Sequence, residues 1–271
     1  MTKPPINRDT RLCISLSERP SNFGTRFHNR LYDLISLDYV YKAFATTDIV
    51  GAVAGIRALN VRGCAISMPF KEAVIPLLDG LAPSAAAIDS VNTIVNDDGV
   101  LTGHNTDYAA VRRLVEESGA DPAQPILLRG SGGMAKAVAA AFHDAGFTQG
   151  TIVARNPATG PALAERYGYR WQAELGQTTA PVLVNVTPLG MAGSDEGALA
   201  FPPEEIEAAS LIVDVVAMPT ETPLLKAASG KPTITGAEII VLQALEQFTL
   251  YTGVTPTEAQ VVEAADWARA G

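Results

Sequence analysis

A glycine-rich turn near the middle of the chain constrains the fold more than any other feature of the sequence. Residues 126–146, ILLRGSGGMAKAVAAAFHDAG, have the pattern of a buried strand, a turn and a helix rich in small residues. Glycines in such a turn let the backbone approach a pyrophosphate, whose charge then faces the N–H groups that begin the helix. Ala135 stands where the G-x-G-x-x-G pattern has its third glycine. The sequence therefore predicts a dinucleotide site at Gly130, Ser131, Gly132 and Gly133.

The next predicted strand, GTIVAR, indicates which dinucleotide would bind. It ends in Arg155, where an NAD site would carry Asp or Glu. A carboxylate there bonds the ribose 2′-hydroxyl, whereas an arginine accommodates a 2′-phosphate. Arg155 and the neighbouring Asn156 therefore favour NADP over NAD. No second basic residue follows within PATGPALAE, which predicts a weak clamp on the phosphate.

Short apolar runs alternate with longer helical patterns along the chain. The runs are LCISL, YVYKAF, GCAIS, PILLRG, GTIVAR, PVLVNV and LIVDVV. This alternation predicts the α/β class with parallel sheets. Roughly 120 residues precede the glycine turn, enough for a separate α/β domain. Residues 117–125 have the composition of a linker, and two amphipathic stretches after Gly236 must pack back on a domain.

Composition excludes several classes of protein. Twenty basic against 29 acidic residues give a formal net charge of −9, which argues against binding to nucleic acid or an anionic membrane. No apolar run reaches the roughly 20 residues of a membrane span. Cys13 and Cys64 lack metal-ligand spacing, and His28, His104 and His143 form no metal triad. We expect a soluble cytoplasmic protein with buried thiols and no metal.

Three polar residues of the first half could form a proton-transfer site. Lys71, in AISMPFKEAVIPLLD, follows a strand and begins a predicted helix, whereas Asn92 and Asp107 lie in separate polar turns. A lone lysine is usually a solvated surface charge. If the three residues converge in a cleft, however, a lysine paired with a carboxylate can serve as a general acid or base.

Seven segments of the chain occur together in one family. SMPFKEAVIPLLD, SVNTIVNDDG, GHNTD, GSGGMAKA, NVTPLGM, TPLL and LQALEQFTLYTG have the order and spacing of the shikimate dehydrogenase family, which the sequence resembles over nearly its whole length. The resemblance implies an α/β substrate-binding domain over residues 1–107, a Rossmann-like NADP-binding domain over 108–235, and C-terminal helices over 236–271 that return to the first domain. It also implies reversible hydride transfer between NADP(H) and shikimate/3-dehydroshikimate, or quinate in some branches.

The same resemblance assigns roles to individual residues. The catalytic lysine and its aspartate partner fall on Lys71 and Asp107. Substrate-binding positions fall on Ser15, Ser17, Ser67, Asn92 and Gln243. Cofactor-binding positions fall on Gly130, Ser131, Gly132, Gly133, Arg155 and Asn156. The expected partner is a small cyclic hydroxy acid, and the expected assembly is a monomer or homodimer.

The loop after the first strand departs from the family pattern. In the family, a serine pair that holds the substrate carboxylate lies a few residues before His-Asn. Here Ser15 and Ser17 are separated from His28 by an apparent insertion. Alignment backward from His28 would place Asn22 and Gly24 at those positions instead. We favour the serines because they end the first strand.

A second departure is Ala217, which replaces a tyrosine near the substrate and nicotinamide. Together the two changes predict a divergent branch with low shikimate turnover. One alternative is an NADP-binding accessory or sensor protein with the same fold. Another is a methylene-tetrahydrofolate dehydrogenase, which the NTD and VNTI segments disfavour.

Overall fold

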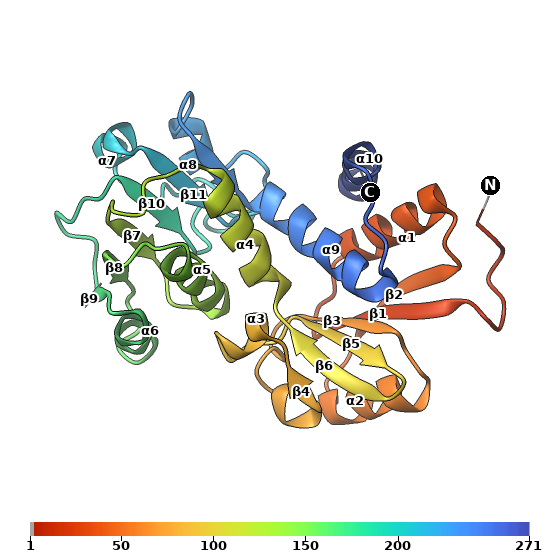
Figure 1. Ribbon diagram of the computed structural model, residues 1–271. Helices are drawn as coiled ribbons and strands as arrows, with labels where there is room; N and C mark the ends of the chain where they lie inside the picture. The colour runs from red at the N-terminus through yellow and green to blue at the C-terminus, as the bar shows by residue number, and fades with distance from the viewer. Residues whose placement is uncertain (1–2, 271) are drawn as a thin grey trace. The chain divides into compact units, whose positions relative to one another are not determined.

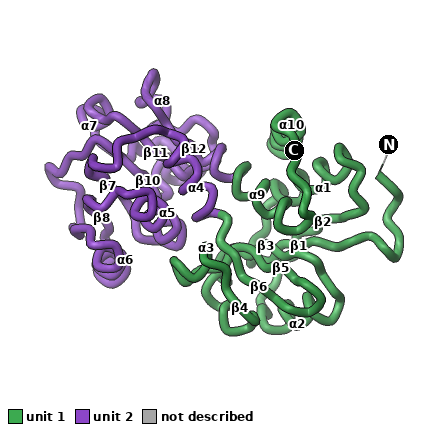
Figure 2. Tube along the Cα trace, in the orientation of Figure 1, with its two compact units in different colours: residues 1–106, 241–271 green, residues 107–240 purple. Residues whose placement is uncertain are grey.

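A computed structural model describes residues 3–270 and divides the chain into two compact units (Figures 1 and 2). Unit 1 comprises residues 1–106 and 241–271, and unit 2 comprises residues 107–240. Each unit contains one six-stranded sheet with helices packed on it, so the predicted α/β class is confirmed. The boundaries of the units fall close to the predicted domain limits after residues 107 and 235. The domain limits themselves stay a prediction. Residues 117–125, expected to be a linker, lie wholly inside unit 2.

Unit 1 is built on a mixed sheet with the strand order β2-β1-β3-β5-β6-β4. Its strands are β1 (Arg11–Ser17), β2 (Tyr39–Ala45), β3 (Gly63–Ile66), β4 (Gly80–Leu81), β5 (Thr93–Asp97) and β6 (Val100–His104). Its helices are α1 (Phe23–Ile35), α2 (Ile49–Ala58), the 3₁₀ helix η1 (Ile75–Leu77), α3 (Pro83–Ala86), most of α9 (Gly236–Thr252), and α10 (Glu258–Arg269).

The prediction of parallel sheets does not hold throughout the sheet of unit 1. Strand β5 runs antiparallel to both β3 and β6. Asp98 and Gly99, with φ of 52° and 94°, form the two-residue connection between β5 and β6. Two successive residues with positive φ match the twist of a hairpin, and an Asp-Gly pair adopts them readily. The polar segment NDDG is therefore a hairpin turn.

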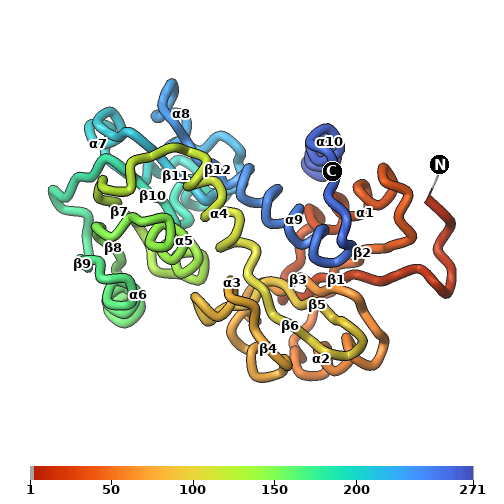
Figure 3. Tube along the Cα trace, viewed as in Figure 1, coloured from red at the N-terminus to blue at the C-terminus, as the bar shows by residue number. Residues whose placement is uncertain are grey.

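Two apolar clusters cover the faces of the unit 1 sheet. On one face, Val53 and Ile56 of α2 pack with strand residues such as Ile14 and Ile94. On the other face, Phe27 of α1 packs with residues of α9 and α10. Figure 3 shows these first and last helices together in unit 1, so the predicted return of the C-terminal helices to the first domain is confirmed. Cys13 and Cys64 are free and buried in the two clusters, as expected.

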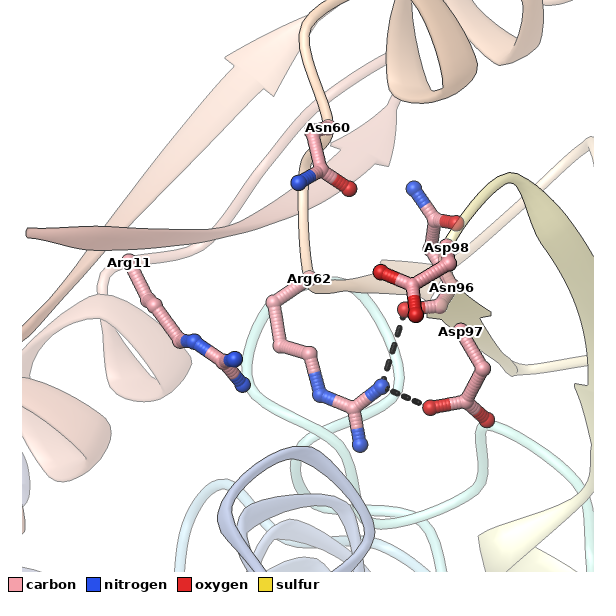
Figure 4. A pocket seen from close by; sticks show the side chains of 6 residues that line it. All are labelled: Arg11, Asn60, Arg62, Asn96, Asp97 and Asp98. Carbon is pink, nitrogen blue, oxygen red and sulfur yellow. Dashed lines mark hydrogen bonds and ion pairs between the residues drawn. The ribbon is translucent and has the colours of Figure 1, made fainter. Parts of the chain in front are cut away.

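Arg62 links helix α9 to the sheet of unit 1 through hydrogen bonds. Its Nε donates to the carbonyl of Tyr251 (2.8 Å) and its Nη2 to that of Leu250 (3.2 Å), near the C-terminus of α9. Its Nη1 donates to Asn96 O (2.8 Å) and pairs with Asp97 (Figure 4). Arginine thus satisfies carbonyls that a helix end leaves without partners. The polar pocket of about 190 Å³ around Arg62 contains none of the predicted site residues.

Unit 2 has a fully parallel sheet with the order β12-β11-β10-β7-β8-β9. Its strands are β7 (Ile126–Arg129), β8 (Gly150–Val153), β9 (Arg170–Gln172), β10 (Val182–Asn185), β11 (Leu211–Asp214) and β12 (Thr233–Thr235). Its helices are α4 (Thr106–Glu117), α5 (Gly133–Asp144), α6 (Thr159–Tyr167), α7 (Pro203–Ala208) and α8 (Pro223–Ala227).

The strand order of unit 2 reverses between β7 and β10. Helices α5 and α6 cover one face of the sheet, and α7 and α8 cover the other (Figure 1). In such doubly wound sheets a ligand binds beyond the carboxyl ends of the strands at the reversal. The glycine turn follows β7, so the topology places it at this reversal. Across residues 3–270, no helix is both long and apolar enough to cross a membrane.

Candidate functional site

The glycine turn of unit 2 has the geometry that a phosphate requires. Gly130 has φ of +123°, and a Cβ added there would lie 2.9 Å from the carbonyl oxygen of Val186. Only glycine is tolerated at such a position. At Gly132 and Gly133, by contrast, a Cβ would meet no atom within 4 Å. The backbone is therefore open on the side where a ligand would approach.

The N-terminus of α5 has no side-chain cap. Its N-cap residue is Gly132, so no side chain accepts a hydrogen bond from the first N–H groups of the helix. An anion in front of the helix would satisfy these donors and the positive end of the helix dipole. The Ser131 hydroxyl lies 2.7 Å from that of Thr159, at the start of α6. These residues fit the pyrophosphate of a dinucleotide.

Arg155 and Asn156 lie in the connection between β8 and α6, and both are exposed. The Asn156 side-chain oxygen accepts from the backbone N–H groups of Ala158 (2.9 Å) and Thr159 (3.1 Å). Asn156 thus shapes the loop, whereas Arg155 presents the cation. An exposed arginine at this position fits the prediction that the site favours the 2′-phosphate of NADP over the 2′-hydroxyl of NAD.

In unit 1, the predicted serines lie on two segments that run together. The Ser67 N–H donates to Leu16 O (3.0 Å), and the Glu18 N–H donates to Met68 O (3.3 Å). The end of β1 and the segment after β3 are thereby joined, with Ser17 buried and Ser67 exposed. Ser15 lies beside the phenol of Tyr41 and half-buried. The three serines thus lie on two hydrogen-bonded segments, and their role as substrate ligands stays a prediction.

The alternative residues occupy a different local setting. Asn22 is the exposed N-cap of α1, and its side chain makes no capping bond. Gly24 lies in the first turn of α1, where an added Cβ would be 3.5 Å from the Tyr41 hydroxyl.

Asn92 is the centre of a buried polar network in unit 1. Its backbone joins β3 to β6, because Ile66 N donates to Asn92 O (2.7 Å) and Asn92 N donates to His104 O (3.0 Å). Its side-chain oxygen accepts from Thr106 N and from the Thr93 hydroxyl, each at 2.8 Å. Only 3% of Asn92 is exposed. Its orientation is therefore held from several directions.

The network continues to α9. The Thr106 hydroxyl accepts from the Asn92 amide (3.0 Å) and lies within hydrogen-bond distance of Gln243 Oε1 (3.3 Å). Gln247 donates to the Thr93 hydroxyl (3.0 Å). The sequence interpretation missed Thr93, Thr106 and Gln247 as parts of the site. The spacing of Gln243 and Gln247 was an available signal, because residues i and i+4 share a helix face.

The proposed catalytic residues flank this network along the chain. The carbonyl of Lys71 accepts from Val91 N (2.8 Å), the residue before Asn92. Lys71 lies in a turn rather than at the start of a helix, because only the 3₁₀ helix η1, with Pro76, follows. Asp107 follows Thr106 in the first turn of α4. Both side chains are half-buried.

His28 and Asn29 connect α1 to the edge strand β2. Asn29 donates to Tyr41 O (2.8 Å) and accepts from Tyr41 N (3.0 Å), so its amide satisfies both backbone groups of Tyr41 on the edge strand β2. The His28 ring stacks on Tyr41 with centroids 4.5 Å apart. Burial lowers the pKa of His28 to about 3, against a smaller opposing effect of Gln247. The described residues contain no group of His, Cys, Asp and Glu suited to a metal ion.

The segment carrying Ala217 is anchored by Asp214. The carboxylate accepts from Asn185 (2.9 Å) and Val216 N (3.2 Å) through one oxygen, and from the Thr222 hydroxyl (2.6 Å) through the other. Burial raises the pKa of Asp214, and these hydrogen bonds oppose the rise. The segment from 215 to 221 is thus closed at both ends, with Ala217 half-buried within it.

Comparison with known proteins assigns this architecture. Residues 22–94 match the shikimate dehydrogenase substrate binding domain. A shikimate dehydrogenase-like protein of Haemophilus influenzae is 55% identical over 267 residues, covering 97% of this chain and 98% of the relative. The chain belongs to the shikimate dehydrogenase family. Family membership removes the methylene-tetrahydrofolate dehydrogenase alternative.

Further members of the shikimate dehydrogenase family also match the chain. A shikimate dehydrogenase (NADP(+)) of Pelodictyon phaeoclathratiforme is 34% identical, with 86% of this chain and 88% of the relative covered. The solved shikimate 5-dehydrogenase of Thermus thermophilus, in complex with NADP(H) and shikimate, is 30% identical with a TM-score of 0.84, covering 95% and 99% of the two chains. A solved shikimate 5-dehydrogenase-like protein has 54% identity and a TM-score of 0.95, covering 98% and 100%.

Proposed function

We propose that this family member is an NADP-dependent oxidoreductase that interconverts a cyclic hydroxy acid and its ketone. The observation that carries the proposal is the open, uncapped glycine turn of unit 2, with Arg155 after the adjoining strand. The NADP-dependent shikimate dehydrogenases among the relatives support it. The buried Asn92 network of unit 1 provides the matching set of oriented polar groups for a hydroxylated substrate.

Lys71 and Asp107 are proposed to move the proton. In the oxidation direction, the substrate carbon that becomes the carbonyl loses a hydride, and its hydroxyl group loses a proton. Bound NADP supplies the hydride chemistry. Lys71 Nζ takes the hydroxyl proton, and the Asp107 carboxylate stabilises the ammonium that forms; a positioned proton-transfer group contributes about 10²–10⁴-fold to rate.

We propose that the substrate is bound by Asn92, Gln243 and the serines Ser15, Ser17 and Ser67. Asn92 and Gln243 are linked through Thr106, so they would bind hydroxyl groups as a prearranged pair. Prearrangement matters because a misplacement of about 1 Å can cost about 10²-fold in rate. The serines, at the end of β1 and after β3, would meet the carboxylate.

The substrate is proposed to differ in shape from shikimate. The family resemblance implies that residues 18–22, which are exposed, add length after β1 and that the half-buried Ala217 replaces a tyrosine, so we expect extra space there. A related acid such as quinate, or a differently shaped polyol acid, would use this space, with Arg19 or Asn22 as added contacts for its carboxylate. Turnover of shikimate itself is proposed to be low.

The test is a spectrophotometric screen for NADPH formation. Shikimate, quinate and related polyol acids are each offered with NADP and with NAD. Turnover of one acid with NADP, lost in Lys71→Ala, supports the proposal. Tight NADP binding with no turnover of any acid would favour the accessory or sensor role, which the altered loop and Ala217 suggest.

A further inference from the structure

Arg129 lies at the carboxyl end of β7, directly before Gly130. Its backbone is fixed on both sides, because Arg129 O accepts from Val186 N (2.9 Å) and Gly130 N donates to Val153 O (2.8 Å). The half-buried side chain donates through Nη1 to the carbonyl of Ala200. A guanidinium has five N–H donors, so this bond leaves most of them available.

Arg129 and Arg155 belong to the same edge of the unit 2 sheet. The parallel register pairs Arg129 with Val153, and Arg155 follows Val153 by two residues. Paired residues of neighbouring strands share a face, and alternate residues along a strand share it too. Val153 and Leu127, two residues before Arg129, both belong to the cluster on the α7–α8 face. The two arginines thus lie at the carboxyl ends of neighbouring strands, Arg129 as the last residue of β7 and Arg155 in the bend two residues after β8.

Their charges interact and have no counter-ion. Burial lowers the pKa of Arg129, and the positive charge of Arg155 lowers it further. Within residues 3–270, neither guanidinium forms an ion pair with a carboxylate. Placing a half-buried cation beside a second cation is unfavourable unless an anion joins them. This pair therefore indicates an anion site beside the glycine turn.

We propose that Arg129 and Arg155 together bind the 2′-phosphate of NADP. The inference rests on the proposed NADP-dependent function and names a specificity residue on the strand before the glycine turn. It differs from the expectation of a weak clamp, which counted only basic residues after Arg155 in the sequence. The phosphate dianion would neutralise both cations, and Ala200 O would hold the Arg129 guanidinium in place.

Equilibrium binding tests the proposal without turnover. Calorimetric titrations with NADP, NAD and 2′,5′-ADP compare the unmodified chain with Arg129→Gln, Arg155→Ala and the double variant. Arg170→Gln is the matched control, since Arg170 is an exposed arginine of the same unit that pairs with Thr151, toward the opposite end of β8. Charge-assisted bonds to phosphate predict that Arg129→Gln weakens NADP and 2′,5′-ADP about 10- to 100-fold. NAD affinity should change less than about twofold, because NAD lacks the phosphate.

The outcomes separate this inference from the proposed function. If the unmodified chain binds neither dinucleotide, or binds both equally, both proposals fail. If it prefers NADP and Arg129→Gln leaves that preference unchanged, only the role of Arg129 fails. An equal loss of NADP and NAD affinity would also refute it, since that result marks a purely structural arginine. Arg129→Lys retains the charge and should keep part of the NADP preference if the glutamine variant fails to fold.

Discussion

The Asn92 side chain and Thr106 exchange hydrogen bonds in both directions. Thr106 N donates to Asn92 Oδ1 (2.8 Å), and the Asn92 amide donates to the Thr106 hydroxyl (3.0 Å). Fourteen residues separate them in the sequence. The pair joins the residue before β5 to the first residue of α4, directly before Asp107. It therefore connects a proposed substrate ligand to the backbone that carries a proposed catalytic residue.

Thr106→Val should impair both stability and substrate binding. Valine has nearly the shape of threonine, but it leaves the buried Asn92 amide without its acceptor, at a cost of about 1–3 kcal/mol in unfolding free energy. Because Asn92 loses its fixed orientation, we expect KM for the best acid to rise more than kcat falls. Urea unfolding and steady-state kinetics measure the two effects. Thr102→Val, on the half-buried part of β6, is the control, and matching behaviour of the two variants would contradict the prediction.

Lys71→Ala and Asp107→Ala should each lower kcat by about 10²–10⁴-fold on the best acid. Both side chains are half-buried outside the apolar clusters, so the unfolding free energy should change little. Exposed Lys226 provides the control as Lys226→Ala. Turnover near that of the unmodified chain in either catalytic variant would exclude the assigned roles.

Shikimate should be a poor substrate, with kcat/KM below the common enzymatic range of about 10⁴–10⁸ M⁻¹s⁻¹. Ala217→Tyr returns a phenol to the segment anchored by Asp214, and we expect kcat/KM for shikimate to rise by about tenfold as the acid is held more firmly. Ala173→Tyr, at an exposed position in the same unit, should have no such effect. A kcat/KM for shikimate already within that range, and unmatched by any other acid, would mean that the sequence departures are neutral.

Stability should decrease as the pH falls through the titration range of His28. Its folded pKa of about 3 lies below the ordinary value of 6.5, so the unfolded chain binds the proton first. The stabilising contribution is full above pH 6.5 and is lost between pH 6.5 and 3, by at most about 1.4 kcal/mol per pH unit. The surrounding phenols of Tyr32, Tyr41 and Tyr251 stay protonated there. His28→Phe should flatten the pH dependence of urea unfolding; an unchanged slope would contradict the prediction.

The two ends of the glycine turn should respond differently to alanine. Gly130→Ala forces a Cβ against Val186 at positive φ and should destabilise the fold. Gly132→Ala meets no protein atom, so the melting temperature should change little while NADP and NAD both bind at least about tenfold more weakly. Thermal melts and cofactor titrations distinguish the two. If Gly132→Ala bound both cofactors as tightly as the unmodified chain, the proposed pyrophosphate site at the turn would be wrong.

Local patterns in the sequence were sufficient for strands β7, β8, β10 and β11 and for helix α5 of unit 2. The run ILLR, the spacing of Gly130 and Gly132, and the small residues of α5 all lie within one continuous stretch of chain. Their conformation follows from backbone freedom and apolar periodicity, which are visible in one stretch of chain. The Asp98-Gly99 hairpin was equally local. It was nevertheless not predicted from the NDDG segment.

Tertiary structure alone decided which distant residues act together. Gln247 donates to Thr93 across 154 positions of the sequence. Arg129 and Arg155 share one sheet edge only because β7 and β8 pair in parallel register. The residues next to each of these side chains in the sequence do not reveal its partner in space. Folding decides which groups surround a buried amide or an unpaired cation. The sequence determined the glycine turn and the elements around it. Burial orients Asn92, and strand register brings the two arginines to one sheet edge. Both effects arise only when separate elements pack, because hydrogen bonds and charge interactions depend on distance in space.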